Sequence, residues 1–189
     1  MREIEVKAKV RDREKILETL KGQGITLTEP QTEIDTLFSV TPDFYEEYEK
    51  GNIPPVGLTR IREQSNGTVT ITYKKRKAGV HLDKVEYEVV TSDAKNAKAL
   101  LSAIGLVPIL VMQKTRQKSH IGGYEICLDE VAELGTYIEI EKLLDESDMT
   151  KGEDVQKELW DILLSFGISR ADEVHVGYDI LKHQYDLKK

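Results

Sequence analysis

The first ten residues alternate charged and apolar side chains in a pattern that could hold a metal–phosphate complex. Apolar residues occupy every second position from Ile4 to Val10, and the charged residues between and around them are Glu3, Glu5, Lys7 and Lys9. Because successive side chains of a strand point to opposite faces, the segment predicts a strand with one charged face and one apolar face. Two such carboxylates can share Mg²⁺ or Mn²⁺, and a nearby ammonium can bind the phosphate that the cation contacts. A half-solvated strand with a charged outer face is the alternative, so the interpretation depends on whether the pattern recurs.

Basic residues recur in the segment 57–76, which is typical of a hairpin around Ser65-Asn66-Gly67. A two-residue Asn-Gly turn would place Arg60 and Arg62 on the face opposite Lys74. A three-residue loop with Gly67 in the left-handed conformation shifts the pairing by one residue. We favour the three-residue loop because it separates polar from apolar side chains. It gives one polar face with Arg60, Arg62, Thr70, Thr72, Lys74 and Arg76.

Three further segments with strand-like alternation have acids on one face. These faces hold Glu86 and Glu88 in the first segment, Glu125, Cys127 and Asp129 in the second, and Tyr137, Glu139 and Glu141 in the third. The segment 109–119 places Lys114 and Arg116 on one face. Buried acids need cations and buried bases need anions, because an unpaired buried charge is costly. A metal–polyphosphate complex satisfies both sets together.

The elements that must position these residues are antiparallel strands with a few helices between them, which predicts an α+β fold. Amphipathic helices are predicted near 12–21, 93–104 and 152–166. Asp12 can cap the first helix, and Ser92 can cap the second, whose apolar side would hold Ala97, Leu100, Leu101 and Ile104. A sheet with helices outside and charges inside can close into a polar tunnel.

The composition is that of one ordinary soluble domain, which we expect to span residues 1–189. A chain of 189 residues with 39% hydrophobic content can bury a sizeable core, and its net charge of −7 argues against a nucleic-acid partner. No apolar run approaches the roughly 20 residues of a membrane span, and the N-terminus lacks the pattern of a signal peptide. Cys127 is the single cysteine, so we expect a reducing, cytoplasmic location.

Eight short motifs occur in order from residue 3 to residue 181. They are Glu3-x-Glu5-x-Lys7, Arg60-x-Arg62, Thr72-Tyr73-Lys74, Lys114-x-Arg116, Leu128-Asp129-Glu130-Val131, Leu134-Gly135-Thr136-Tyr137, Glu139-Ile140-Glu141 and Tyr178-Asp179-Ile180-Leu181. Together they resemble the triphosphate tunnel metalloenzymes, or CYTH superfamily, which includes class IV adenylate cyclases and thiamine triphosphatases. Leu37 departs from the tyrosine expected after Asp35, and Gly177 departs from the serine usual before Tyr178. Both departures lie outside the charged set and bear on the subfamily more than on the general chemistry.

The resemblance implies a closed eight-stranded antiparallel β-barrel with helices on the outside, which binds a triphosphate with one or two Mg²⁺ or Mn²⁺ ions. The metal ligands it implies are Glu3, Glu5, Asp129, Glu139 and Glu141. The phosphate-binding residues it implies are Lys7, Arg60, Arg62, Lys74, Lys114 and Arg116. Within these sets we expect catalytic roles for Glu5, Lys7, Lys74 and Arg116. Glu86 and Glu88 either pair with the bases of the tunnel or act directly in catalysis.

Three functions remain open for such a tunnel. The branch that the chain most resembles is the class IV adenylate cyclases, in which the ribose 3′-hydroxyl of ATP attacks the α-phosphorus and pyrophosphate leaves. The first alternative is hydrolysis of the terminal phosphate of tripolyphosphate or thiamine triphosphate. The second is a polyphosphate- or nucleotide-binding module without turnover, although binding alone needs fewer acids than the two Glu-x-Glu pairs provide. A homodimer is an expectation from the family only.

Overall fold

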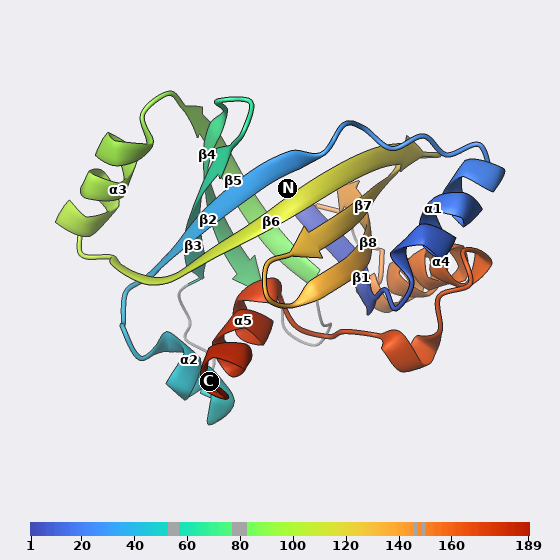
Figure 1. Cartoon of the computed structure of the whole chain (residues 1–189). Helices are drawn as coiled ribbons and strands as arrows, with labels where there is room; N and C mark the ends of the chain where they lie inside the picture. Colours follow the sequence, from blue (N-terminus) through green and yellow to red (C-terminus); the bar gives the residue numbers. More distant parts are fainter. Residues whose placement is uncertain (53–56, 77–82, 146, 149) are drawn as a thin grey trace.

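Eight strands form one closed antiparallel barrel, in the order β1-β5-β4-β3-β2-β6-β7-β8 (Figure 1). The computed structural model describes residues 1–52, 57–76, 83–145, 147–148 and 150–189. The strands are β1 Arg2–Lys9, β2 Gln31–Ser39, β3 Leu58–Gln64, β4 Val69–Arg76, β5 Asp83–Thr91, β6 Val107–Ile121, β7 Tyr124–Val131 and β8 Gly135–Leu144. This architecture confirms the predicted α+β class and the closed eight-stranded barrel.

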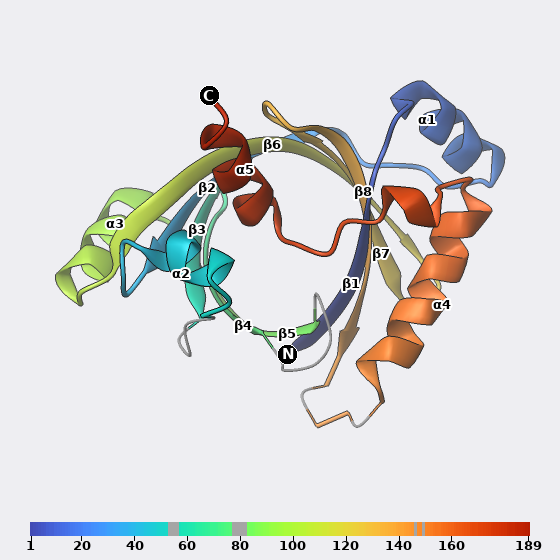
Figure 2. The ribbon, with the colours of Figure 1, turned by 90° about the horizontal axis from the view of Figure 1, so that it is seen from below.

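The helices lie outside the barrel wall (Figure 2). They are α1 Arg13–Gly22, α2 Phe44–Glu49, α3 Ala94–Ala103, α4 Gly152–Ser165 and α5 Tyr178–Asp186, with a short 3₁₀ turn at Arg170–Asp172. In Figure 2, α1 and α4 lie on one side of the barrel and α3 on the other, while α2 and α5 lie near one barrel opening. None of the described helices is long and apolar enough to cross a membrane.

The main hydrophobic core lies between the outer faces of β1, β7 and β8 and the helices α1 and α4. Ile4, Ile126 and Ile138 are fully buried there against Leu159 and Leu163 of α4. Glu3, Glu5 and Lys7 of β1 consequently face the barrel interior, as the alternation predicted. Asp12 caps α1, since its carboxylate accepts a hydrogen bond from the backbone N–H of Lys15 at 3.1 Å. The predicted first strand and first helix are therefore confirmed.

The β3–β4 hairpin has the register that the separation of polar and apolar residues predicted. Arg60 pairs with Thr72 and Arg62 with Thr70, so these side chains share a face. Gly67 has a φ of 86°, in the left-handed region. The backbone N–H of Gln64 donates to the carbonyl of Thr68 at 2.9 Å, which closes a three-residue loop.

The structure corrects the prediction for α3. Its N-cap is Asp93 instead of Ser92, because the Asp93 carboxylate accepts from the N–H of Asn96 at 2.9 Å and occupies the N-cap position. The predicted apolar side is only half right. Ala97 and Leu101 pack against the barrel, whereas 58% of Leu100 and 64% of Ile104 are exposed.

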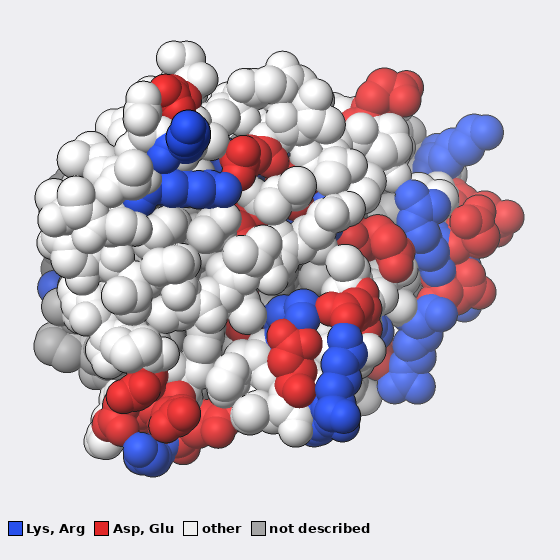
Figure 3. All heavy atoms as spheres, turned by 60° about the vertical axis from the view of Figure 1, so that its left-hand side comes forward, with Lys and Arg blue, Asp and Glu red and all other residues white. Residues whose placement is uncertain are grey.

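Two further features were not predicted. Helix α5 was missed because it is short, and its burial depends on a distant partner: Ile180 packs against Phe44 and Tyr45 of α2. None of the described helices covers the outer face of β5, where 55% of Tyr87 and 60% of Val89 are exposed. On the side of the molecule in Figure 3, residues other than Lys, Arg, Asp and Glu occupy much of the surface, and the charged side chains form separate groups.

Candidate active site

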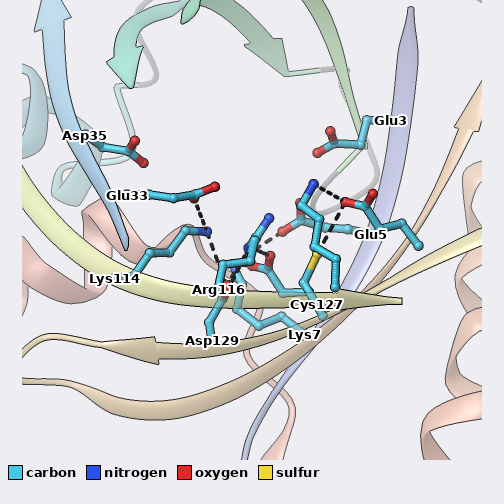
Figure 4. A network of polar contacts seen from close by, with 12 residues as sticks. Glu3, Glu5, Lys7, Glu33, Asp35, Lys114, Arg116, Cys127 and Asp129 are labelled. Atoms are coloured by element: carbon cyan, nitrogen blue, oxygen red, sulfur yellow. Dashed lines mark hydrogen bonds and ion pairs between the residues drawn. The ribbon is translucent and has the colours of Figure 1, made fainter. Parts of the chain in front are cut away.

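The inward faces of the strands enclose a cavity of about 1420 Å³. Ten of the eleven predicted metal and phosphate residues line this cavity, and Asp129 lies fully buried behind Arg116. Figure 4 shows the acids and bases of opposite walls pointing toward the middle of the barrel. The closed barrel therefore brings together side chains that are far apart in the sequence.

Three carboxylates converge at one part of the wall. Glu5 pairs directly with Glu141 across the β1–β8 ladder, and Glu3 is two residues from Glu5 on the same face. One oxygen from each of the three carboxylates lies within 4.8 Å of the other two. Burial, followed by the charge of Glu3, raises the pKa of Glu141 to about 8. A divalent cation would relieve this repulsion, and a set of carboxylate oxygens fits a hard ion such as Mg²⁺ or Mn²⁺.

Cys127 lies beside this cluster without strengthening it as a hard-metal site. Its thiol is fully buried and contacts Glu125 at 3.4 Å. Burial is the main cause that raises the thiol pKa well above its usual value. A neutral thiol is a poor ligand for Mg²⁺, so the three carboxylates are the better candidate site.

Lys84 of β5 contacts two of the three converging carboxylates, and the sequence analysis did not identify it as a site residue. Its Nζ donates to Glu3 Oε1 at 2.8 Å and to Glu5 Oε2 at 2.7 Å. Burial alone would raise the pKa of Glu3, but Lys84 and then Lys74 lower it to about 2. The signal in the sequence was the alternation with Glu86, because Lys84 precedes it by two residues on the same strand face.

The other two predicted metal ligands, Asp129 and Glu139, form ion pairs with basic side chains instead. Arg116 binds Asp129 through two bonds, of 2.6 Å from Nε and 2.5 Å from Nη2, and Nη2 also contacts Glu139. Lys7 Nζ lies 3.0 Å from Glu139 Oε1. Burial would raise the pKa of Glu139, but Lys7 and Arg116 lower it well below its usual value. The structure thus divides the five predicted acids into three that converge and two that orient bases.

The opposite wall pairs arginines and lysines with two acids of β2, Glu33 and Asp35. Arg62 binds Asp35 with two hydrogen bonds of 2.7 Å, the forked geometry that guanidinium groups form with carboxylates. Glu33 Oε2 lies 2.8 Å from Arg62 Nη1 and 3.5 Å from Lys114 Nζ. The sequence analysis missed both acids as site residues, although their spacing of two residues places them on one strand face.

Lys74, Glu86 and Glu88 form the third part of the wall. Lys74 Nζ contacts Glu86 Oε1, and Glu88 accepts a bond of 2.8 Å from the Thr72 hydroxyl. Glu88 also lies 4.0 Å from Arg60 Nη2. Of the two roles left open for these acids, the contacts favour pairing with the tunnel bases.

One buried donor in the cavity, Arg60 Nε, makes no hydrogen bond to any described part of the chain. The buried hydroxyl of Tyr178 lies beside the carboxylate of Asp129. Tyr178 begins α5 and is 8% exposed, and Lys7 Nζ lies 4.1 Å above its ring. Lys7 also donates to the carbonyl of Val176 at 3.2 Å. A donor without an acceptor beside a basic wall is suited to an anion.

Comparison with known proteins agrees with this geometry. The CYTH domain family model matches residues 1–178. A Methanocaldococcus jannaschii protein named "Putative adenylate cyclase" is 28% identical over 184 residues, which cover 94% of this chain and 97% of the relative. A solved Pyrococcus horikoshii structure has 27% identity and a TM-score of 0.78, and covers 96% of this chain and 99% of that one.

A more distant solved structure shares the fold alone. It is a Hippeastrum protein described as a "putative adenylyl cyclase" with a dominant triphosphatase activity. It has 14% identity and a TM-score of 0.56, and the match covers 93% of this chain and 90% of that one.

Proposed function

This chain belongs to the CYTH domain family, and on that premise we propose that it is a metal-dependent enzyme that converts ATP to cyclic AMP and pyrophosphate. The observation that most supports this is the convergence of Glu3, Glu5 and Glu141 in a cavity with a buried basic wall. In the proposed reaction the ribose 3′-hydroxyl releases its proton to solvent as its oxygen bonds to the α-phosphorus. The bond from that phosphorus to the bridging oxygen breaks, and pyrophosphate leaves with the electron pair.

The proposed metal ligands are the three converging carboxylates, Glu3, Glu5 and Glu141. Mg²⁺ or Mn²⁺ would neutralise charge on the phosphate oxygens when bound. Asp129 and Glu139, which the family resemblance also implies as ligands, have a proposed role in orienting Arg116 and Lys7, because each already contacts one of these bases. The proposed metal site therefore has three carboxylate ligands, whereas the family resemblance implies five.

The proposed phosphate-binding residues are the bases of the cavity. They are Lys7, Arg60, Arg62, Lys74, Lys114 and Arg116. Arginine binds phosphate oxygens through a planar fork and lysine acts as a movable point charge. Arg60 Nε would add a donor that has no partner within the described residues. Positioning and charge stabilisation are the main requirements of phosphoryl chemistry.

Hydrolysis of the terminal phosphate is the second candidate function. The same cavity can support either reaction, since they differ in which phosphorus meets the nucleophile. The Hippeastrum protein, which shares the fold, is described with a dominant triphosphatase activity, so this fold is compatible with hydrolysis. Water would attack the terminal phosphorus of tripolyphosphate, thiamine triphosphate or ATP.

The products formed with Mg²⁺ or Mn²⁺ separate these functions. We expect ATP to give cyclic AMP and pyrophosphate, detected by chromatography and ³¹P NMR. Orthophosphate from any of the triphosphates would instead support the hydrolase. Tight binding without turnover would contradict both and support a binding module.

A single substitution tests the proposed metal site. Glu5→Gln keeps the size of the side chain but removes a charge, so we expect metal-dependent turnover to be lost while thermal unfolding shows a folded protein. Glu14→Gln is the matched control, since 82% of the Glu14 side chain is exposed on α1. Wild-type turnover by Glu5→Gln would contradict the assignment.

A further inference from the structure

Lys84 occupies the seam between β1 and β5, where only three residue pairs join the strands in the described part of the chain. Its backbone pairs with that of Glu3, and 13% of its side chain is exposed. The ammonium lies among three carboxylates: Glu3 at 2.8 Å, Glu5 at 2.7 Å and Glu86 at 3.8 Å. A lysine therefore sits on two of the three acids proposed to bind the metal.

Both oxygens of Glu5 have a cationic partner. Lys84 Nζ lies 2.7 Å from Oε2, and Lys7 Nζ lies 3.3 Å from Oε1. A divalent ion needs carboxylate oxygens at about 2.1 Å and repels an ammonium on the same group. Both ammonium groups consequently oppose metal binding at Glu5, and withdrawal of one of them relieves this repulsion.

The other contacts of the two lysines indicate which of them withdraws. Lys7 is 2% exposed and is also held by Glu139, by the carbonyl of Val176 and by the Tyr178 ring. Lys84, by contrast, forms ion pairs with Glu3, Glu5 and Glu86. Glu86 is not one of the three converging carboxylates, so it offers Lys84 a second position. Lysine has a long flexible stem, so Lys84 can move toward Glu86 without leaving the cavity.

We propose that Lys84 is a displaceable counter-ion of the metal site. In the free protein its ammonium neutralises Glu3 and Glu5. When a divalent cation binds these carboxylates, the ammonium moves to Glu86 or to an anionic oxygen of the bound triphosphate. This inference rests on the proposed metal site and adds a specific competitor to it. Lys84 thereby lowers the affinity for metal in the absence of substrate.

Titration of the substrate-free protein with Mn²⁺ tests this inference. Free Mn²⁺ is measured by electron paramagnetic resonance at one fixed pH. We expect Lys84→Met to bind Mn²⁺ about tenfold more tightly than the wild type, because a charge-assisted competitor has been removed. Unchanged or weaker binding by this variant would overturn the inference.

Lys74→Met is the matched control for the loss of any nearby positive charge. Lys74 also lines the cavity, with 23% of its side chain exposed. Its ammonium contacts Glu86 and acts on Glu3 through its charge without an ion pair. We expect a clearly smaller gain in Mn²⁺ affinity than for Lys84→Met. Equal gains would show a general electrostatic effect and overturn the specific role of Lys84.

Lys84→Arg keeps the test decisive if Lys84→Met does not fold. Its guanidinium retains the charge and can bind both carboxylates through its fork, so we expect Mn²⁺ binding no tighter than in the wild type. Tighter binding would overturn the inference. Because substrate is absent, a failure to turn over ATP would leave this result intact. If neither the wild type nor Lys84→Met binds Mn²⁺, the inference is wrong whatever turnover shows.

Discussion

At the scale of single residues, the cavity is built from charges that neutralise one another. Lys7, Arg62, Lys114 and Arg116 are each 8% exposed or less, and each lies within ion-pair distance of a carboxylate. Removing one partner from such a pair is costly because it leaves an unpaired buried charge. The acids outside the proposed metal site therefore keep the basic wall of the cavity stable without a bound anion.

Glu141 makes a prediction about stability and pH in the metal-free protein. Its folded pKa of about 8 lies above the ordinary value of 4.5, so between these values the folded state holds a proton that the unfolded state has lost. The contribution of Glu141 to stability consequently falls as pH rises through this window. Glu141→Gln mimics the protonated form and should be more stable than the wild type at pH 8 by about 4 kcal/mol.

The difference between wild type and Glu141→Gln isolates this group. Urea unfolding with a chelator present, at pH 5 and at pH 8, measures it. We expect a small difference at the lower pH and a large one at the higher pH. Equal differences at the two pH values would contradict the raised pKa of Glu141.

At the scale of elements, strand alternation decides which residues reach the cavity. The rows of charged residues that alternate along the strands face the cavity, together with a few apolar residues such as Leu37 and Met112. A shift of one residue in a ladder would turn such a charged row to the outside of the barrel. The β3–β4 loop fixes one such register. It aligns Arg60 with Thr72 and Arg62 with Thr70, which places both arginines in the basic wall.

Substitution of Gly67 tests the conformation of this hairpin loop. A Cβ at this position would meet no atom within 4 Å, but φ is +86°. The cost of Gly67→Ala is therefore one of backbone conformation, and we expect a loss of about 1 kcal/mol in the free energy of unfolding. Gly22→Ala, at the end of α1 where φ is not left-handed, should instead stabilise by about 0.5 kcal/mol. A loss of the same size at both positions in urea unfolding would contradict this explanation.

At the scale of the whole molecule, the main hydrophobic core lies on the outer side of the barrel wall. Its interior is filled with charged side chains and cavity, so the main apolar cluster lies between the wall and the helices α1 and α4. These helices supply hydrophobic burial that the interior does not provide. This arrangement separates the energetics of folding from the chemistry of the site.

Two neighbouring leucines of α4 test whether the core outside the barrel stabilises the fold. Leu163 is fully buried in the core, whereas Leu164 is 46% exposed. We expect Leu163→Ala to lower the free energy of unfolding by about 3 kcal/mol, and Leu164→Ala by less than about 0.5 kcal/mol. Urea denaturation measures both, and comparable losses would contradict an outer core held by α4.

The sequence by itself determined the features that depend on neighbouring residues. The alternation around Ile4 and Glu5 identified the two faces of β1, and Asp12 marked the start of α1. The left-handed Gly67 fixed the hairpin register. These follow from the two-residue period of a strand and from hydrogen bonds that span three residues. The same locality explains the error at Ser92, where the true cap, Asp93, is one position away.

Only the tertiary structure decided which charged residues meet. Glu5 and Glu141 become neighbours through the β1–β8 ladder, and Glu3 meets Lys84 through the β1–β5 seam. Asp129 has the same alternating pattern as the converging acids, yet it lies behind Arg116. The pairing of strands distant in the chain depends on barrel order and register, which local periodicity does not encode. That is why the sequence predicts an acidic and basic tunnel, while the closed barrel selects the three acids that face one another and the lysine between two of them.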